Sequence, residues 1–382
     1  MSQKNVSKVT VTAFIVHDDK VLIIKRAPRE DFLPNVYELP SGKINFGEPP
    51  EKGLRREVKE EVGLDIDPVK PFYVFDYTSK RGKEKWHSVE IAYICILKSL
   101  PTSVTLSEDH TDYAWIREDE IGSYDITDEI KKLIYAGFRK NMLKVAVDGL
   151  TGTSKGLICA QVACNTGLLF FYTGLIYRGV VHIALEHGVG ISDFEKFYNK
   201  DLLKMINDGE LNYIWDPDNK QARVIYKGKD ITRIISSLKY NEITTKWAKR
   251  HSGTIDNILR IFLERFPYPG YICEGKGTAK YLIPDAQVKF FFIADPKDRA
   301  RIIIKKEKTL GDNMKRDRET VARVQDVIHW IDETDRKRER SGLALVEGIH
   351  IIDTSTRKRK DAVQKFESMV RDKALELSIK LK

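Results

Sequence analysis

The stretch GKINFGEPPEKGLRREVKEEVGL (42–64) decides the fold of the first part of the chain. Its second half predicts a helix over residues 48–63. Pro49 and Pro50 suit the first turn of a helix, where a missing backbone N–H does no harm. Gly63 suits the position after the last turn, where a left-handed backbone closes a helix. The stretch therefore predicts a loop that leads into one short, capped helix.

Three carboxylates of this helix fall on one side. Glu57, Glu60 and Glu61 are related as i, i+3 and i+4, and like charges at this spacing repel by a few tenths of a kcal/mol, roughly, per pair. Hard oxygen ligands suit Mg²⁺ or Mn²⁺, with phosphate oxygens completing the shell. Such a metal polarises a phosphoryl oxygen and lowers the pKa of bound water, so it promotes attack on a pyrophosphate. The alternative is a solvated acidic helix face.

The full spacing is more specific than the helix alone. It is G-x5-E-x7-R-E-apolar-x-E-E-x-G-apolar, beginning at Gly42. This pattern resembles the Nudix box without a departure, so residues 1 to about 140 resemble a Nudix hydrolase domain. The segments YELPSG (37–42) and SEDHTDYAWI (107–116) are similar to the parts of that family that flank the box.

The resemblance implies a sheet sandwiched by helices and the hydrolysis of a nucleoside diphosphate linked to a group X. It implies that a metal is held by the carbonyl of Gly42 and the carboxylates of Glu57, Glu60 and Glu61. Arg56 and Glu48 would hold the loop against the helix, and Asp109 is the closest match to a further downstream acid. The general base, the nucleotide base and the leaving group stay open.

The residues around the box alternate as β-strands do. The runs 8–17, 20–26 and 88–97 have strand character, and 126–140 has the pattern of a closing helix. After residue 140 the pattern changes to a buried strand and a glycine-rich turn, with almost no linker between the two parts. We therefore place a domain boundary near residue 142, which predicts a Nudix hydrolase domain over 1–142 and a second domain over 143–382.

The second domain opens with a buried strand, KVAVD (144–148), that leads directly into GLTGTSKGL (149–157). A helix is expected over about 155–166. Short buried strands are expected at 271–275, 288–295 and 348–355, with helical stretches between the strands. This order predicts a parallel α/β sheet with helices on both faces. In that context the backbone N–H groups of the loop would face an anion at a helix N-terminus.

Later segments extend the interpretation of this loop. FFYTGLIYRG (170–179), GYICEGKGTAKYLIPDAQVKFFFIADPKDRAR (270–301) and DETDRKRER (332–340) follow it in order. Together they resemble the phosphate loop, monophosphate segment, middle strand and arginine lid of a cytidylate kinase. The resemblance implies ATP at the loop and a P-loop nucleoside monophosphate kinase-like domain. It implies these nucleotide-binding residues: Gly149, Gly152, Ser154, Lys155, Gly156, Thr173, Arg178, Arg336 and Arg338.

The motifs of this domain are degenerate. Leu157 replaces the hydroxyl that would hold Mg²⁺, Tyr172 replaces an aspartate, and Gly277 replaces a carboxylate. Ile331 and Thr334 stand where lid arginines are expected. Because phosphoryl transfer depends on positioned metal and cations, these departures predict weak or altered kinase activity. A scaffold with a vestigial loop, a kinase of altered specificity and an ordinary cytidylate kinase remain as alternatives.

The overall composition is that of an ordinary globular chain. It has 382 residues, of which 42% are hydrophobic and 32% charged, so two or more domains are expected. No apolar run approaches the ~18 residues that a spanning helix needs, which predicts no membrane partner. The four cysteines form no CxxC and no signal segment is evident, which favours a reduced, cytoplasmic protein.

The net charge of +9 suits phosphate-rich partners. The first hypothesis is a nucleotide enzyme, in which one domain cuts a nucleotide derivative and the other binds or phosphorylates a monophosphate. The second is an RNA- or ribonucleoprotein-binding factor that uses both folds as scaffolds. The intact carboxylates favour the enzyme, because a scaffold gains nothing from three like charges on one face. The sequence leaves the oligomeric state open.

Overall fold

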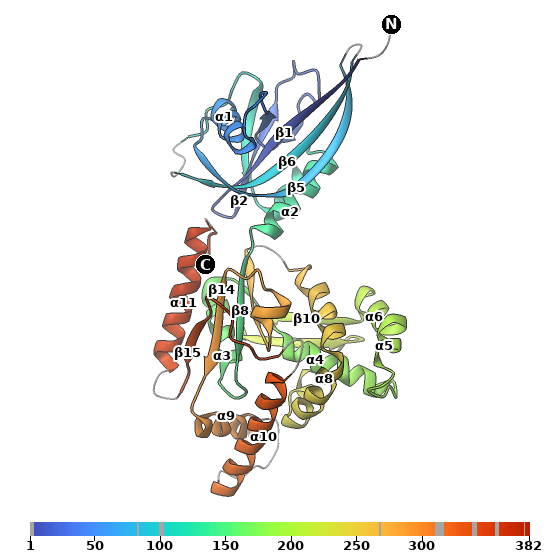
Figure 1. The fold of residues 1–382 in the computed structure, drawn as a ribbon, viewed down its shortest axis with the longest axis vertical. Helices are drawn as coiled ribbons and strands as arrows, with labels where there is room; N and C mark the ends of the chain where they lie inside the picture. The colour runs from blue at the N-terminus through green and yellow to red at the C-terminus, as the bar shows by residue number, and fades with distance from the viewer. Residues whose placement is uncertain are drawn as a thin grey trace. The chain divides into compact units, whose positions relative to one another are not determined.

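The computed structural model describes residues 4–81, 84–98, 103–266, 269–309, 317–337, 342–355, 359–377 and 379–382. The chain forms two compact units, and each is described by itself (Figure 1). The first contains Met1–Met142 with Ala374–Lys380, and the second contains Leu143–Lys373 with Leu381–Lys382.

The first unit is built on one mixed sheet. Its strands are β1 (Lys4–His17), β2 (Lys20–Arg26), β3 (Tyr37–Glu38), β4 (Ser41–Lys43), β5 (Ile66–Arg81), β6 (Glu84–Leu97) and β7 (His110–Ile116). They pair in the order β3-β2-β1-β6-β5, and β4 and β7 pair with β1 and β2. β1 and β6 run parallel, whereas β5 and β6 form a long antiparallel pair. The sequence did not indicate β5.

The helices of this unit are α1 (Pro50–Val62), the 3₁₀ helix η1 (Glu118–Ser123) and α2 (Asp128–Lys140). The predicted cap of α1 is confirmed, because Gly63 has φ 71° and donates its N–H to the carbonyl of Lys59. α2 begins after Thr127, whose hydroxyl accepts the N–H of Ile130 at 3.4 Å. Both helices therefore occur close to where the sequence predicts them.

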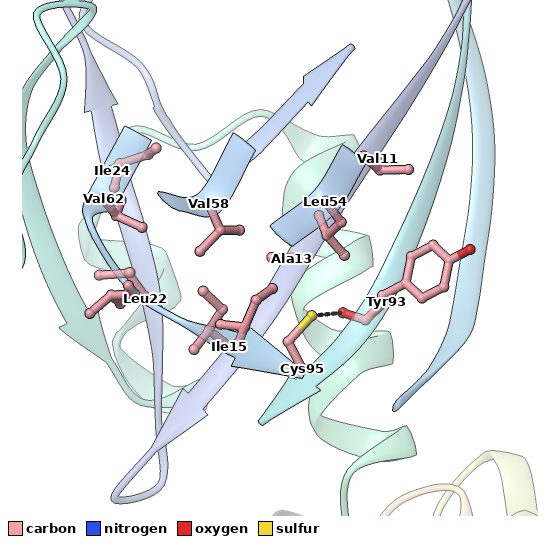
Figure 2. Close-up of a cluster of buried hydrophobic side chains, with 12 residues drawn as sticks. Val11, Ala13, Ile15, Leu22, Ile24, Leu54, Val58, Val62, Tyr93 and Cys95 are labelled. Atoms are coloured by element: carbon pink, nitrogen blue, oxygen red, sulfur yellow. Dashed lines mark hydrogen bonds between the residues drawn. The ribbon is translucent and has the colours of Figure 1, made fainter. Parts of the chain in front are cut away.

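Successive side chains of β1 point to opposite faces of the sheet and pack against two different helices. Val11, Ala13 and Ile15 pack with Val58 and other apolar residues of α1 in one buried cluster (Figure 2). Phe14 points to the other face, where its ring meets Phe138 of α2 edge-on at 5.3 Å. Because successive strand side chains alternate, one strand builds both layers of an α/β/α sandwich. This arrangement places α1 and its carboxylates over one face of the sheet.

The second unit contains a parallel sheet. Its strands are β8 (Leu143–Gly149), β9 (Leu169–Tyr172), β13 (Gly270–Glu274), β14 (Val288–Ile293) and β15 (His350–Asp353). They pair in the order β15-β14-β8-β13-β9, every pair parallel. A small antiparallel sheet of β10 (Leu211–Asp216), β11 (Gln221–Tyr226) and β12 (Lys229–Asp230) was not expected from the sequence.

Helices flank the parallel sheet (Figure 1). They are α3 (Lys155–Thr166), α4 (Thr173–Glu186), α5 (Phe194–Phe197), η2 (Tyr198–Leu202), α6 (Leu203–Asn207), α7 (Thr232–Ile235), α8 (Leu238–Leu263), η3 (Thr278–Leu282), α9 (Pro296–Thr309), α10 (Arg318–Arg336) and α11 (Arg359–Glu376). The predicted fold class is confirmed for both units. None of the helices in the described ranges is long and apolar enough to cross a bilayer.

The loop between β8 and α3 lies at the carboxyl edge of this sheet. β8 ends at Gly149 and α3 begins at Lys155, so the loop follows the central strand directly. Gly149 has φ 143°, and a Cβ there would lie 2.4 Å from the backbone oxygen of Phe292 on β14. Only glycine allows this close approach. In open α/β sheets this edge is where ligands bind.

Candidate active site

Arg56 connects the loop to helix α1 in the first unit. Its Nη2 and Nε donate to the two carboxylate oxygens of Glu48 at 2.9 and 3.1 Å, and Nη2 also donates to the carbonyl of Lys43 at 3.1 Å. The paired guanidinium lowers the pKa of Glu48 to about 2. Nη1 contacts Glu57 at 2.8 Å and Glu60 at 3.1 Å. One cation is therefore shared among three carboxylates.

Two carboxylates of the helix are partly withdrawn from water. Glu61 accepts the backbone N–H of Ser41 at 2.8 Å, and burial raises its pKa well above the ordinary value. Burial also raises the pKa of Glu57, although Arg56 opposes the shift. Desolvated carboxylates are unfavourable as anions unless a cation is close. The two side chains therefore present a site that a cation would stabilise.

Gly42 lies directly against Glu57. A Cβ at this position would come within 2.0–2.4 Å of the Glu57 carboxyl group. A side chain at this position would displace the Glu57 carboxyl group from its place beside strand β4. The fold therefore brings Gly42, Glu57 and Glu61 together, as expected for residues that would hold one metal ion.

The other predicted acids lie differently. The Glu60 side chain is 57% exposed and contacts Arg56. Asp109 is exposed as well, and its recorded ion pair is with Arg29 at 3.7 Å. Across the described ranges, no three His, Cys, Asp or Glu side chains are already gathered around one metal position. The donors are all hard oxygens and two of them are desolvated, so the residues present fit Mg²⁺ in chemistry and in charge.

One carboxylate beside this group was missed by the sequence analysis. Glu38 on β3 lies close enough to raise the pKa of Glu61 further by charge repulsion. It accepts from Arg26 Nη1 at 2.7 Å. Its place in the YELPSG segment was the available signal, but strand pairing rather than spacing brings it near α1.

A cavity of about 370 Å³ opens next to these residues. Ser41 and Gly42 line it, together with the aromatic side chains of Phe32, Phe75 and Tyr77. Its size falls in the range of small-molecule sites, which is roughly 300–1,000 Å³. The carboxylates and the cavity therefore share the β4 backbone as a common wall.

The second unit holds a larger cavity of about 710 Å³ around the β8–α3 loop. Lys155 lines it, but its ammonium lies 3.2 Å from Glu274 Oε1 and 3.4 Å from the carbonyl of Leu150. The N–H of Thr151 donates to Asp332 Oδ1 at 3.0 Å. Carboxylates of the chain thus occupy positions around the loop that an anionic ligand would use.

Further ion pairs surround this loop. Arg299 pairs with Asp332 and donates to the carbonyl of Thr151 at 2.7 Å, and Lys276 pairs with Asp335. The sequence analysis missed Arg299 and Asp332, although both lie inside the quoted segments 270–301 and 332–340. Nothing in their spacing shows that α9 and α10 meet at the loop.

Arg178 on α4 is a buried cation with unused hydrogen-bonding capacity. It is 3% exposed, and its Nη1 donates to Asn241 Oδ1 at 2.6 Å. Its guanidinium lies 5.1 Å from the ring centre of Tyr172. Within the described residues, its buried Nε and Nη2 have no hydrogen-bond partner. Because it lines the cavity, an anion there would satisfy both nitrogens.

The remaining predicted residues are placed as follows. Ser154 has φ 59°, so it adopts the left-handed conformation of the glycine it replaces. Thr173 is the first residue of α4 and is buried against Gly275, and Gly156 lies near Glu274. Arg336 is exposed and pairs with Glu333 at 2.7 Å. Arg338 lies outside the described residues.

Comparison with known families matches both units. The NUDIX domain profile covers residues 6–137, and the cytidylate kinase profile covers residues 145–372. The two family resemblances drawn from the sequence are therefore confirmed.

Individual relatives are distant. A cytidylate kinase of Exiguobacterium sp. is 26% identical over 235 residues, which is 61% of this chain and 98% of that protein. A cytidylate kinase of Bacillus licheniformis is 25% identical over 232 residues, 61% of this chain and 97% of the other. Among solved structures, a MutT protein of Methanosarcina mazei is 22% identical and covers 37% of this chain and 99% of its own, with a TM-score of 0.31.

Proposed function

This chain belongs to the cytidylate kinase family through residues 145–372 and carries a NUDIX domain over residues 6–137, and we propose that the two domains act on different nucleotide substrates. The domain of residues 1–142 is a Mg²⁺-dependent hydrolase that cleaves the pyrophosphate bond of a nucleoside diphosphate linked to a group X. The domain of residues 143–382 binds a nucleoside monophosphate and transfers phosphate weakly.

The observation that carries the hydrolase proposal is the pair of half-buried carboxylates beside Gly42. Glu57 and Glu61 are held beside β4, and the absence of a Cβ at residue 42 leaves the Glu57 carboxyl against the backbone. A divalent cation bound there would polarise a phosphoryl oxygen and activate water. Glu57, Glu61, Glu60 and the Gly42 carbonyl would hold it, while Arg56 keeps the loop attached to the helix.

Two roles within the hydrolase stay as predictions. Asp109 would assist from the start of β7, and because its side chain is exposed we expect Asp109→Asn to reduce turnover less than Glu61→Gln does. The general base is one of the carboxylates around α1, and Glu38 joins the candidates through its position beside Glu61.

The test is a hydrolysis assay on the full-length chain with Mg²⁺ and a panel of nucleoside diphosphate derivatives that differ in base and in X. We expect turnover of at least one member of the panel. Glu61→Gln is expected to reduce turnover on the order of 10³-fold, because it removes a carboxylate that would hold the divalent cation, and that cation would offset the charge that develops on the phosphoryl oxygens. Glu51→Gln, which changes an exposed residue on the same helix, is the matched control and should leave turnover unchanged.

Absence of turnover across the panel, or equal rates for Glu61→Gln and the wild type, would refute the hydrolase. Salt-dependent RNA binding that survives substitution of Glu57, Glu60 and Glu61 would instead support the RNA-binding factor, because counterion release does not involve this site.

A second candidate function follows from Arg178. Its two unpartnered nitrogens in a 710 Å³ cavity favour an anionic ligand such as a nucleoside monophosphate. We expect binding of CMP or dCMP to weaken by about 10-fold or more in Arg178→Met, since a hydrogen bond to a charged group contributes roughly 1.5–3 kcal/mol. Phosphoryl transfer from ATP should be slow because Leu157, Ile331 and Thr334 supply no metal ligand or cation. Turnover of CMP at ordinary kinase rates would contradict this.

A further inference from the structure

One face of the first unit's sheet is unusually polar for a buried surface. The parallel register of β1 and β6 pairs Thr10 with Glu90, and the antiparallel register of β5 and β6 pairs Phe75 with Glu90. Paired residues of adjacent strands point to the same side. These three side chains therefore share the face opposite to Val11, which packs in the α1 cluster (Figure 2). All three line the 370 Å³ cavity.

The polar groups of this face are buried and only partly satisfied. Glu90 is 6% exposed and accepts a hydrogen bond from the Thr12 hydroxyl, a residue 78 positions away in sequence. The Thr10 hydroxyl is also buried, and within the described residues it has no hydrogen-bond partner. A buried polar group without a partner costs about 1–3 kcal/mol. A fold that keeps such groups against a cavity is suited to a ligand that bonds to them.

Aromatic rings form another wall of the same cavity. Phe32 and Tyr77 are stacked, with centroids 5.7 Å apart and planes at 10°. Phe75 extends this row at 6.2 Å from Tyr77, with planes at 29°. A planar heterocycle adds naturally to a row of rings, since base–aromatic stacking contributes roughly 1–3 kcal/mol. The cavity therefore has aromatic rings on which a planar ligand can stack and, at Thr10 and Glu90, polar groups that can form hydrogen bonds with it.

The cavity adjoins the carboxylates of α1 through a shared backbone. Ser41 and Gly42 line the cavity, while the N–H of Ser41 donates to Glu61 and Gly42 lies against Glu57. A ligand whose ring lies on the aromatic wall could therefore extend its phosphates toward these carboxylates. A nucleotide has this layout, with a planar base at one end and phosphates at the other.

We propose that this cavity holds the nucleobase of the substrate and that Glu90 accepts a hydrogen bond from an N–H on the edge of the base. Glu90 is then the residue that selects the base, whereas Phe32, Phe75 and Tyr77 hold any base by stacking. The inference rests on the proposed hydrolase and assigns the part of its substrate that the α1 carboxylates leave undefined.

The first experiment compares kcat/KM for substrates that share one X and differ only in base. In Glu90→Gln, the amide oxygen can keep the Thr12 contact while an NH₂ replaces the other oxygen and can no longer accept a hydrogen bond. We expect the ratio between the best and the worst base to fall by about 10- to 100-fold. Phe32→Leu should instead reduce kcat/KM for all bases by a similar factor, because every base has a face that stacks. Glu51→Gln should leave both the ratio and the rates as in the wild type.

The second experiment measures binding without hydrolysis. Nucleoside monophosphates are added to the full chain without divalent metal, and hydrogen exchange is followed in peptides from β1 and β6. We expect protection that depends on the base in the wild type and loses that dependence in Glu90→Gln. Melting curves of the variant verify that the unit remains folded.

The outcomes separate the two claims. If the wild type cleaves no substrate but base-dependent protection of β1 and β6 is present and lost in Glu90→Gln, the hydrolase fails and the base site stands. If the wild type cleaves substrates and Glu90→Gln keeps the wild-type ranking of bases, the base site is overturned and the hydrolase stands. Protection that is absent, or identical for all bases in both proteins, also overturns the inference.

Discussion

The charged groups around helix α1 and those around the β8–α3 loop are balanced in opposite ways. In the first unit, Arg56 is shared by Glu48, Glu57 and Glu60, and Glu61 accepts a hydrogen bond from the backbone N–H of Ser41. Carboxylates there outnumber the cations that contact them. In the second unit the cations around the loop have carboxylates of their own, as the pairs Lys155–Glu274, Lys276–Asp335 and Arg299–Asp332 show.

This difference predicts different responses to ligands. A divalent cation in the first unit would complete a site that is short of positive charge. A phosphate at the loop of the second unit must first displace carboxylates that already hold its cations. Removing one partner of a desolvated ion pair strongly destabilises the folded protein, because the other charge is left buried and unpaired. A phosphate-loop sequence therefore does not by itself provide an accessible phosphate site.

The largest expected effect concerns Lys155. Lys155→Met leaves Glu274, which is 2% exposed, without its ammonium partner, so the second unit should lose about 3 kcal/mol of unfolding free energy. Hydrogen exchange of peptides from β8 and β13 in the full chain measures the loss. The double variant Lys155→Met/Glu274→Gln should recover most of it, since no buried charge remains. A single variant as stable as the wild type would mean that the ion pair contributes little.

The next effect tests the first unit with metal. Mg²⁺ at 100 times its dissociation constant should stabilise this unit by roughly 2.7 kcal/mol, and chelation should remove the gain. Exchange of peptides from α1 reports it. In Glu61→Gln the gain should largely disappear, whereas Glu51→Gln should behave as the wild type. Equal stabilisation of all three proteins would place the metal elsewhere.

A smaller effect is expected at Ser154. This residue has φ 59° and ψ 13°, a left-handed conformation that L-residues with a side chain adopt at a cost of about 1–2 kcal/mol. Glycine removes that strain but loses more entropy on folding, so Ser154→Gly should stabilise the second unit by about 0.5–1 kcal/mol. Ser192→Gly, at an exposed position outside the left-handed region, should not stabilise it. Urea unfolding compares the two variants.

The smallest effect is the acid response of Glu48. Its folded-state pKa of about 2 lies below the ordinary value of 4.5, so its contribution to stability is present above pH 4.5 and is lost as the pH falls through 2. Glu48→Gln should therefore lower the melting temperature of the first unit slightly at pH 7, and the difference should vanish near pH 2. A constant difference between these pH values would show that charge is not its cause.

Much of the fold was open to prediction because its signals are local. The spacing of residues 42–64 indicated a helix, and α1 spans Pro50–Val62 with Gly63 as its cap. The run of strand, glycine loop and helix likewise indicated β8 and α3. The small sheet β10–β12 escaped prediction because few of its side chains are buried, so its strands have no continuous apolar run of the kind that marks β13 or β14.

Which residues share a face of a helix or strand follows from the order of residues alone, because helical and strand periodicity are properties of the backbone. It placed Glu57, Glu60 and Glu61 on one side of α1 without reference to the rest of the chain. Long-range folding sets how exposed each of these carboxylates is, brings Glu38 beside Glu61, and places Glu274 and Asp332 around the loop. These arrangements join residues far apart in the chain, and burial and charge pairing depend on the path of the backbone in space rather than on any local repeat.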